Sequence, residues 1–155
     1  MIETTLKVTS TLAQESAVIR LTIPKAQVAQ LMGAAIGELM STVAAQGAGP
    51  AGPLYSYHHR GDPDVFDLEV GVPVSQPISP TGRVTPGELP AVKVVQTVYS
   101  GPYEGLGDGW CEFMQAVEAG DYDLDTPFFE RYVAGPESSP DPAQWRTELN
   151  RVLKS

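Results

Sequence analysis

The chain repeats its own pattern, and this repeat constrains the fold more than any other feature of the sequence. A shift of 74 positions, from 17 to 91, places Ala17-Val18 on Ala91-Val92 and Ile36 on Trp110. Further along, the shift becomes 79 and places residues 66–70 on 145–149. The added residues fall in the turn-rich segment 138–142, where insertions cost little. We interpret the pattern as a tandem duplication; coincidental apolar spacing is the alternative.

Each copy is predicted to run strand, helix, strand, strand. In copy one, about residues 12–74, apolar side chains recur every three or four positions from Val28 to Val43, which predicts a helix. Gly47 is expected to end this helix in a left-handed conformation. Alternating and β-branched residues predict the strands of copy one over residues 16–23, 54–60 and 66–72.

Copy two, residues 91–153, carries the same signals. An apolar stripe from Tyr103 to Val117 predicts its helix, with Gly120 at the end. Its strands are predicted over residues 91–99, 128–134 and 144–152. Cys111 is expected to be a buried, small apolar side chain within the helix.

Two further segments lie outside the copies. Residues 75–90 hold four prolines and are predicted to link the copies, with a short strand near Val84. Residues 6–12 are predicted to form a strand that pairs with the first strand of copy one. One β-α-β-β unit cannot bury both its sheet face and its helix stripe alone. We therefore expect a single α+β domain over residues 1–155, with antiparallel sheets and two helices. In it the two copies pack about a pseudo-two-fold axis and leave a cleft at their junction.

Charge and composition exclude several classes of function. With 10 basic and 19 acidic residues the formal net charge is −9, which argues against direct binding of nucleic acid through its phosphates. The single cysteine excludes a disulfide framework and a multi-cysteine zinc site, and no motif predicts a metal or a cofactor. The start of the chain does not resemble a signal peptide and no apolar run is long enough to span a bilayer, so we expect a cytoplasmic protein without a membrane partner.

The most informative candidate site residue is Glu130. Side chains alternate between the faces of a strand, so Phe128, Glu130 and Tyr132 are expected to share one face. A carboxylate between two aromatic rings can bind a cation by charge and by cation–π attraction. The alternative is a solvent-facing strand on which Glu130 pairs with a Lys or Arg.

The charge pattern around the second helix favours the cation receptor. Between Lys93 and Arg131 the sequence holds no Lys or Arg. The acidic residues of this window are Glu104, Asp108, Glu112, Glu118, Asp121, Asp123, Asp125 and Glu130. Most of these carboxylates are expected to be solvated, but together they concentrate cations nearby.

Aromatic residues at equivalent positions of the two copies are candidate walls for the site. Ile36 and Trp110 are repeat equivalents, as are Phe66 and Trp145, and Tyr57 lies on the copy-one strand that mirrors the Glu130 strand. These rings are expected either to line a shared central cavity or to belong to the core.

The sequence from Ala91 onward resembles the GyrI-like family, the AraC/BmrR-type effector-binding domains of drug-sensing bacterial regulators and their stand-alone relatives. The resemblance rests on Gly101-Pro102-Tyr103-Glu104-Gly105-Leu106, on Phe129-Glu130-Arg131-Tyr132 and on the segment 141–149. It is weaker over copy one, where residues 67–74 and 87–90 carry it. The segment 105–109 departs from the family by being unusually rich in glycine.

The resemblance implies a tandem β-α-β-β fold and a small-molecule pocket. It implies that Glu130 meets cationic, polyaromatic ligands, and that Tyr103 and Trp145 border the pocket. Our leading hypothesis is therefore a stand-alone binder of cationic or amphipathic aromatic compounds, with Glu130 as counter-ion. Its predicted ligand-binding residues are Glu130, Tyr103, Trp110, Trp145, Tyr57, Phe66, Phe128 and Tyr132.

Two alternatives come from other members of the family. One is a hydrolase of cyclopropane-bearing alkylators in which Glu130 activates water. The other is an interaction protein that inhibits DNA gyrase, with a protein as its partner. The sequence does not decide among these three roles.

Overall fold

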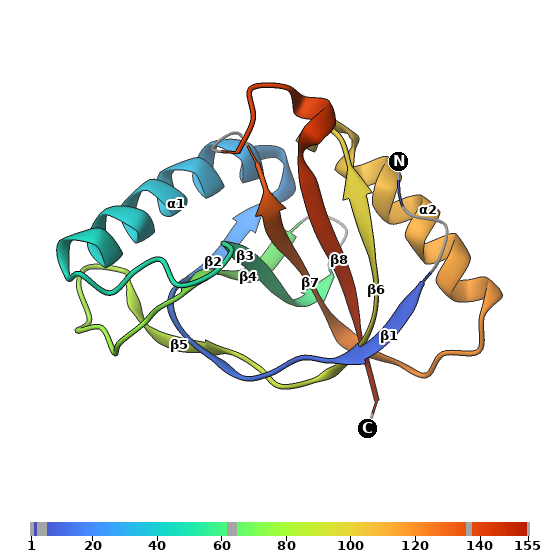
Figure 1. The fold of residues 1–155 in the computed structure, drawn as a ribbon, viewed down its shortest axis with the longest axis horizontal. Coiled ribbons are helices and arrows are strands. Elements are labelled where there is room, and N and C mark those ends of the chain that lie inside the picture. Colours follow the sequence, from blue (N-terminus) through green and yellow to red (C-terminus); the bar gives the residue numbers. More distant parts are fainter. Residues whose placement is uncertain (1, 3–5, 62–64, 136–137, 155) are drawn as a thin grey trace. The chain divides into compact units, whose positions relative to one another are not determined.

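Two α-helices and eight strands make up most of the chain described by the computed structural model, which covers residues 2, 6–61, 65–135 and 138–154. The fold class is α+β, as predicted (Figure 1). The chain divides into two compact units. Unit 1 consists of Met1–Thr11 and Val92–Ser155, and unit 2 consists of Leu12–Ala91.

Unit 2 is a four-stranded antiparallel sheet with one helix on it. Along the chain it contains β2 (Gln14–Pro24), a 3-10 turn (Lys25–Gln27), α1 (Val28–Ala45), β3 (Tyr55–Gly61), β4 (Val65–Pro73) and β5 (Thr85–Leu89). In the sheet the strands lie in the order β3-β4-β2-β5. The predicted strands and helix of copy one are therefore confirmed to within two residues.

The core of unit 2 lies between α1 and one face of this sheet. Ala35, Leu39 and Val43 follow one another at steps of one helical turn, and all three are fully buried. They pack on alternate residues of β2 and β4, among them Ile19 and Leu68. Residues at steps of four lie on one side of a helix, so this stripe fixes which side of α1 meets the sheet. The helix ends at Ala45, and Gly47 two residues later has a φ of 64°, the left-handed conformation predicted for it.

Unit 1 is also a four-stranded antiparallel sheet with one helix. It contains β1 (Lys7–Ser10), β6 (Lys93–Ser100), a 3-10 turn (Tyr103–Gly105), α2 (Leu106–Ala119), β7 (Leu124–Ala134), a 3-10 turn (Pro142–Gln144) and β8 (Arg146–Leu153). Its strands lie in the order β1-β6-β8-β7. The strand before the helix, β6, therefore lies between β1 and β8, as β2 lies between β5 and β4 in unit 2. The duplication and its pseudo-two-fold axis remain predictions from the sequence.

The predicted partner of the first strand is wrong. β1 pairs with β6, with Lys7 opposite Gln96, instead of with β2. The edge of β2 that does not face β4 is occupied by β5, from the segment predicted to be a linker. Thr11 fastens the end of β1 to the start of β6, because its N–H donates to the Val92 carbonyl at 2.8 Å and its hydroxyl accepts from the Val92 N–H at 2.9 Å.

Two local expectations also need correction. β8 begins at Arg146, because residues 142–144 form a 3-10 turn that Asp141 caps by accepting from the Ala143 N–H at 3.1 Å. Gly120 caps the end of α2, as predicted, in an extended conformation with φ −92° and ψ 179°. Cys111 is exposed, because the buried residues of α2 are Gly109, Phe113 and Val117, and position 111 lies on the opposite side of the helix.

The glycines at the start of α2 make room for the ring of Tyr99. A Cβ atom at Gly109 would lie 2.6 Å from Tyr99 Cδ1, and one at Gly105 would overlap the Tyr99 hydroxyl. The Tyr99 hydroxyl donates to the Pro102 carbonyl at 2.7 Å, which holds the ring in place. The glycine-rich segment therefore brings α2 close to β6 and sets the position of the residue that follows, Trp110.

Candidate functional site: a carboxylate between aromatic rings

Two aromatic side chains hold the carboxylate of Glu130. The indole N–H of Trp110 donates to Oε2 at 2.6 Å, and the hydroxyl of Tyr132 donates to Oε1 at 2.7 Å. Trp110 comes from α2, whereas Glu130 and Tyr132 come from β7. Glu130 is half-buried, so it lies neither in bulk solvent nor in the dry core. Short hydrogen bonds to a charged acceptor are the stronger ones, and they fix the direction of the carboxylate.

The register of β7 explains why these side chains meet. Residues Phe128 to Arg131 pair regularly with β8, and the pairing is irregular on either side of this run. Between Arg131 and Ala134, β7 contains one residue more than β8, which is the signature of a β-bulge. Tyr132 lies in that bulge. Bulges redirect side chains, and here the Tyr132 hydroxyl is directed at the carboxylate two residues earlier.

Aromatic rings gather on both sides of Glu130. On one side Trp110 packs edge-on against Phe128, with ring centroids 5.3 Å apart, and also contacts Phe113 at 5.6 Å. On the other side the ring of Tyr103 lies 5.9 Å from Tyr132 and 5.0 Å from Trp145. Because Trp110 and Tyr132 belong to different groups, the carboxylate joins the two. We call Glu130 together with these six rings, all of unit 1, the Glu130 cluster.

Of the two groups of rings, the one formed by Tyr103, Tyr132 and Trp145 is the more accessible. Tyr103 remains 37% exposed, whereas Phe113 is fully buried. The indole N–H of Trp145 donates to the Ser139 carbonyl at 2.9 Å, so this ring offers its face and edges to a ligand but not its donor.

Among the residues that the structure describes, Glu130 has hydrogen-bond donors but no counter-ion. Within residues 2, 6–61, 65–135 and 138–154, no Lys, Arg or His side chain forms an ion pair with it. Its neighbour Arg131 pairs instead with Glu148, at 3.2 Å. The residue opposite Glu130 on β8 is the apolar Leu149. The alternative of a surface ion pair at Glu130 does not describe this site.

Six of the eight predicted binding residues lie together in unit 1; Tyr57 and Phe66 belong to unit 2. Tyr57 in β3 packs edge-on against His59, with centroids 5.2 Å apart. Phe66 in β4 contacts His58 at 5.3 Å, and the ammonium of Lys25 lies 5.0 Å from its ring centre. That Tyr57 and Phe66 line the same pocket as Glu130 stays a prediction.

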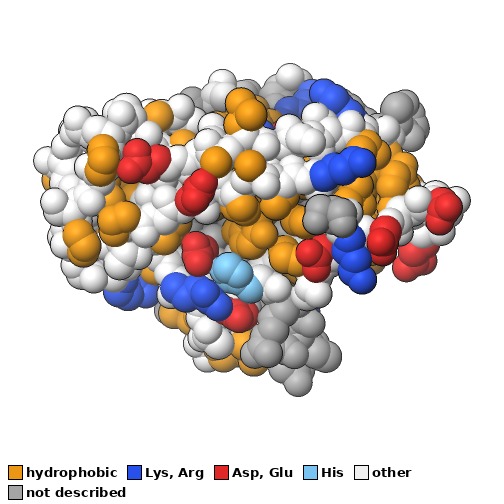
Figure 2. Space-filling model, turned by 90° about the horizontal axis from the view of Figure 1, so that it is seen from below, with side chains coloured by type: hydrophobic (Ala, Val, Ile, Leu, Met, Phe, Trp, Pro, Cys, Tyr) orange, Lys and Arg blue, Asp and Glu red, His pale blue; other side chains and the backbone are white. Residues whose placement is uncertain are grey.

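The two adjacent histidines face opposite sides of their strand. His58 is buried beside Ser56, with Nε2 and Oγ 3.3 Å apart, and burial lowers its pKa to about 4, with His59 and Lys25 adding to the effect. His59 instead contacts the carboxylate of Glu69 at 3.2 Å. Figure 2 shows acidic and basic side chains next to each other on one face of the molecule, with a histidine among them. The histidines therefore do not share one metal site.

Sequence reasoning missed Phe113, which packs under Trp110 three residues further along α2. The spacing of three residues between Trp110 and Phe113 indicates that both lie on one side of α2, but a core residue shows the same spacing. In the described part of the chain, no three His, Cys, Asp or Glu side chains gather in a way that could hold a metal ion. None of the helices among the described residues combines the length and the apolar character needed to span a lipid bilayer.

Several solved structures share this fold. The C-terminal domain of EcmrR has 21% identity and a TM-score of 0.77, over 97% of this chain and 98% of that one. In the EcmrR–DNA complex the identity is 19% and the TM-score 0.79; there 97% of this chain spans only 57% of the longer chain. SAV2435, solved bound to tetraphenylphosphonium, has 14% identity and a TM-score of 0.68, over 97% of this chain and 94% of that one. A hydrolase encoded by lin2189 from Listeria innocua has 14% identity and a TM-score of 0.64, over 96% and 91%.

The family is shown by sequence. No curated protein is similar enough to this chain to count as a match. The GyrI-like small molecule binding domain, however, matches residues 11–150, which include most of both units and the whole Glu130 cluster. The resemblance seen in the motifs is thereby confirmed, and the chain belongs to the GyrI-like family of small-molecule binding domains.

Proposed function

We propose that this domain binds organic cations with aromatic groups, and that the Glu130 cluster is the receptor. One observation carries the proposal: both oxygens of Glu130 are held by aromatic donors, Trp110 and Tyr132, while no cationic side chain of the described residues neutralises it. A half-buried carboxylate that no cationic side chain of the described residues neutralises attracts a cation, and the surrounding rings add cation–π attraction.

The hydrogen bonds narrow the class of ligand. Each carboxylate oxygen already accepts one bond from the protein, so part of its capacity to accept bonds from a ligand is used. A primary ammonium has three N–H donors to satisfy, whereas a phosphonium or a delocalised dye cation has few or none. The cluster therefore suits cations of the second kind, in which the charge is surrounded by apolar groups. Tetraphenylphosphonium, found on SAV2435, is such a cation.

The acidic residues around the Glu130 cluster also favour a cationic ligand. The segment from Val94 to Glu130 contains eight acidic residues and no Lys or Arg. Exposed carboxylates such as Glu112 on α2 add little energy individually because solvent and salt screen them. Together they raise the local concentration of cations and so the rate of encounter.

The test is a titration of tetraphenylphosphonium, followed by Trp fluorescence, into wild type, Glu130→Gln and Glu112→Gln. We expect Glu130→Gln to weaken binding by about 10- to 100-fold, since charged contacts are worth about 1.5–3 kcal/mol. Glu112→Gln removes the same charge from an exposed site and should change affinity by less than about 2-fold. Neutral triphenylphosphine oxide should bind wild type and Glu130→Gln alike. Equal affinity of both Glu→Gln variants for the cation would refute the proposal.

A hydrolase is the second candidate, and the contact between Tyr132 and Glu130 favours it. A carboxylate 2.7 Å from a phenol can accept a proton from water as the water oxygen bonds to a cyclopropane carbon. A strained C–C bond of the ring breaks, and the phenol donates a proton to the anion that forms. One structural neighbour is described as a hydrolase. Incubation with a cyclopropane-bearing alkylator should then give many turnovers per protein, and Glu130→Gln should abolish them. Loss of the compound at the rate seen in buffer would exclude this activity.

A further inference from the structure

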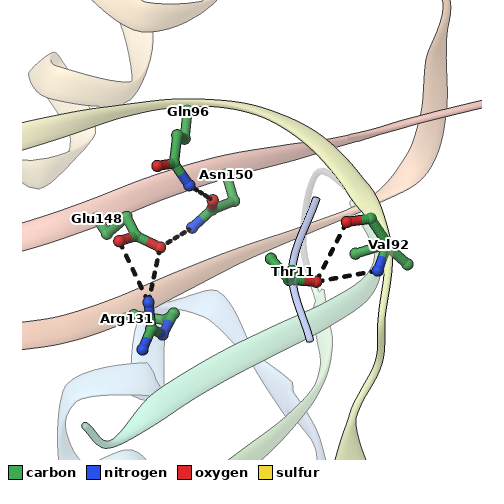
Figure 3. A network of polar contacts seen from close by, with 6 residues as sticks. All are labelled: Thr11, Val92, Gln96, Arg131, Glu148 and Asn150. Carbon is green, nitrogen blue, oxygen red and sulfur yellow. Dashed lines mark hydrogen bonds and ion pairs between the residues drawn. The ribbon is translucent and has the colours of Figure 1, made fainter. Parts of the chain in front are cut away.

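A chain of polar contacts crosses three strands of unit 1 and ends beside Glu130. Gln96 on β6 donates through Nε2 to Oδ1 of Asn150 on β8 at 2.8 Å. Asn150 donates through Nδ2 to Oε1 of Glu148 at 3.1 Å. Arg131 on β7 then donates through Nη1 to both oxygens of Glu148, at 3.2 and 3.3 Å (Figure 3). The four side chains therefore connect β6, β8 and β7 in one line.

Burial makes this chain of contacts rigid. Asn150 is fully buried, and the side chains of Arg131 and Glu148 are only 24% and 15% exposed. The Nε of Arg131 is buried and has no hydrogen-bond partner among the described residues. Glu148 is thus the group that compensates the guanidinium, and a buried charge that loses its partner is costly. The pair has little freedom to separate.

The Arg131–Glu148 pair lies next to the β7 bulge, which sets the geometry of the Glu130 cluster. Arg131 and Glu148 form the last regular rung between β7 and β8 before the bulge. Glu130 immediately precedes Arg131, and Tyr132 immediately follows it. Because side chains alternate along a strand, a contact made by residue 131 on one face fixes the backbone from which residues 130 and 132 project to the other.

We propose that Arg131 and Glu148 are positioning residues, which hold the β7 bulge so that Glu130 meets both Tyr132 and Trp110. Neither residue needs to touch the ligand. The relevance of the pair to binding rests on the proposed function, but its effect on the Glu130 geometry can be measured without any ligand.

The two tryptophans make the ligand-free measurement possible. The indole N–H of Trp110 donates to Glu130, whereas that of Trp145 donates to the Ser139 carbonyl. In a 15N–1H NMR spectrum these two protons give separate signals, which Trp110→Phe assigns. In Glu148→Ala we expect the Trp110 signal to move upfield by at least about 0.3 ppm, because its bond to the carboxylate lengthens, and the Trp145 signal to stay in place. In Glu148→Gln, which keeps an acceptor for Arg131, the Trp110 signal should return toward its wild-type position.

The control is Glu38→Ala, which breaks an exposed ion pair of 2.7 Å to Arg83 in unit 2 and should leave both signals unchanged. If both indole signals move in Glu148→Ala, the change is a general structural disturbance and the positioning role is overturned. If neither signal moves, the positioning role is overturned as well. Should Glu148→Ala not fold, Arg131→Lys gives the same comparison with a milder change.

A binding measurement then tests whether the Arg131–Glu148 pair affects the affinity for a cation. Glu148→Ala should weaken tetraphenylphosphonium binding by about 5-fold or more in the wild-type background, but by less than about 2-fold in a Glu130→Gln background, where no carboxylate remains to be positioned. Equal losses in both backgrounds would overturn it. If Glu130→Gln itself leaves affinity unchanged, the proposed function fails, while the NMR result still decides the positioning role.

Discussion

Replacement of two glycines of α2 by alanine should have opposite effects on stability. Gly107 and Gly109 are both helical, and alanine is favoured over glycine inside a helix by about 1 kcal/mol. Gly107 is exposed, and a Cβ atom there would meet nothing within 4 Å. Gly107→Ala should therefore stabilise the protein by about 0.5–1 kcal/mol.

At Gly109 the same change meets the ring of Tyr99. The new Cβ would lie 2.6 Å from Cδ1 and 3.2 Å from Cε1, atoms close to the base of a buried ring that is held by its bond to Pro102. Overpacking of this kind costs about 1–3 kcal/mol, which offsets or exceeds the gain in helix propensity. Gly109→Ala should thus be less stable than Gly107→Ala by about 1–3 kcal/mol.

Urea unfolding and thermal unfolding measure this difference directly. For a chain of this length, 1 kcal/mol corresponds to about 2–4 °C, so the two variants should differ in Tm by about 2–12 °C. Because Trp110 follows Gly109, the Gly109→Ala variant should also lose affinity for cations, while Gly107→Ala keeps it. Equal stability of the two variants would show that α2 does not depend on close contact with Tyr99.

Three further results are expected. Trp110→Phe keeps a ring but removes the donor to Glu130 Oε2, so it should lower stability by about 1–2 kcal/mol in urea unfolding and weaken cation binding less than Glu130→Gln does; an unchanged stability would mean that the bond is not formed in solution. Cys111 should react with a thiol reagent in the native protein, at one equivalent, and slow reaction that requires denaturant would contradict its exposure. Burial lowers the pKa of His58 to about 4, so its ring stays neutral in the fold while the unfolded chain takes up a proton near pH 6.5. The contribution of His58 to the free energy of unfolding is therefore fully present above pH 6.5 and is lost as the pH falls toward 4. The loss should reach up to about 3 kcal/mol relative to His58→Gln. Parallel stability curves for wild type and His58→Gln over this range would contradict the burial of a neutral ring.

Local periodicity was sufficient to predict most elements of the fold and the side of β7 on which Glu130 and Tyr132 lie. The apolar steps from Val28 to Val43 reappear as the buried stripe of α1. Alternation along β7 correctly placed Glu130 and Tyr132 on one side of the strand, as their hydrogen bond shows. Both signals depend only on residues close together in the sequence, which is where pattern reasoning is strongest.

The features that were missed depend on residues far apart in the chain. The four residues of β1 carry no information on which strand edge they will join, because backbone pairing is largely independent of side chains over so short a length. Trp110 lies twenty positions before Glu130, and only the approach of α2 to the sheet brings its N–H to the carboxylate. The glycines of the segment 105–109, a departure from the family, become understandable only with the ring of Tyr99 beside them.

The pairing of β1 with β6 also determines when unit 1 can form during synthesis. β1 leaves the ribosome before the whole of unit 2, yet its partner strand begins only at Lys93. Unit 2 is a continuous segment and can fold while translation proceeds. Until Lys93–Ser100 emerges, however, the residues of β1 have no native partner strand to pair with. Nascent chains arrested when residue 91 has just left the ribosomal exit tunnel should therefore contain a protease-resistant unit 2 and an N-terminal segment that remains open to cleavage.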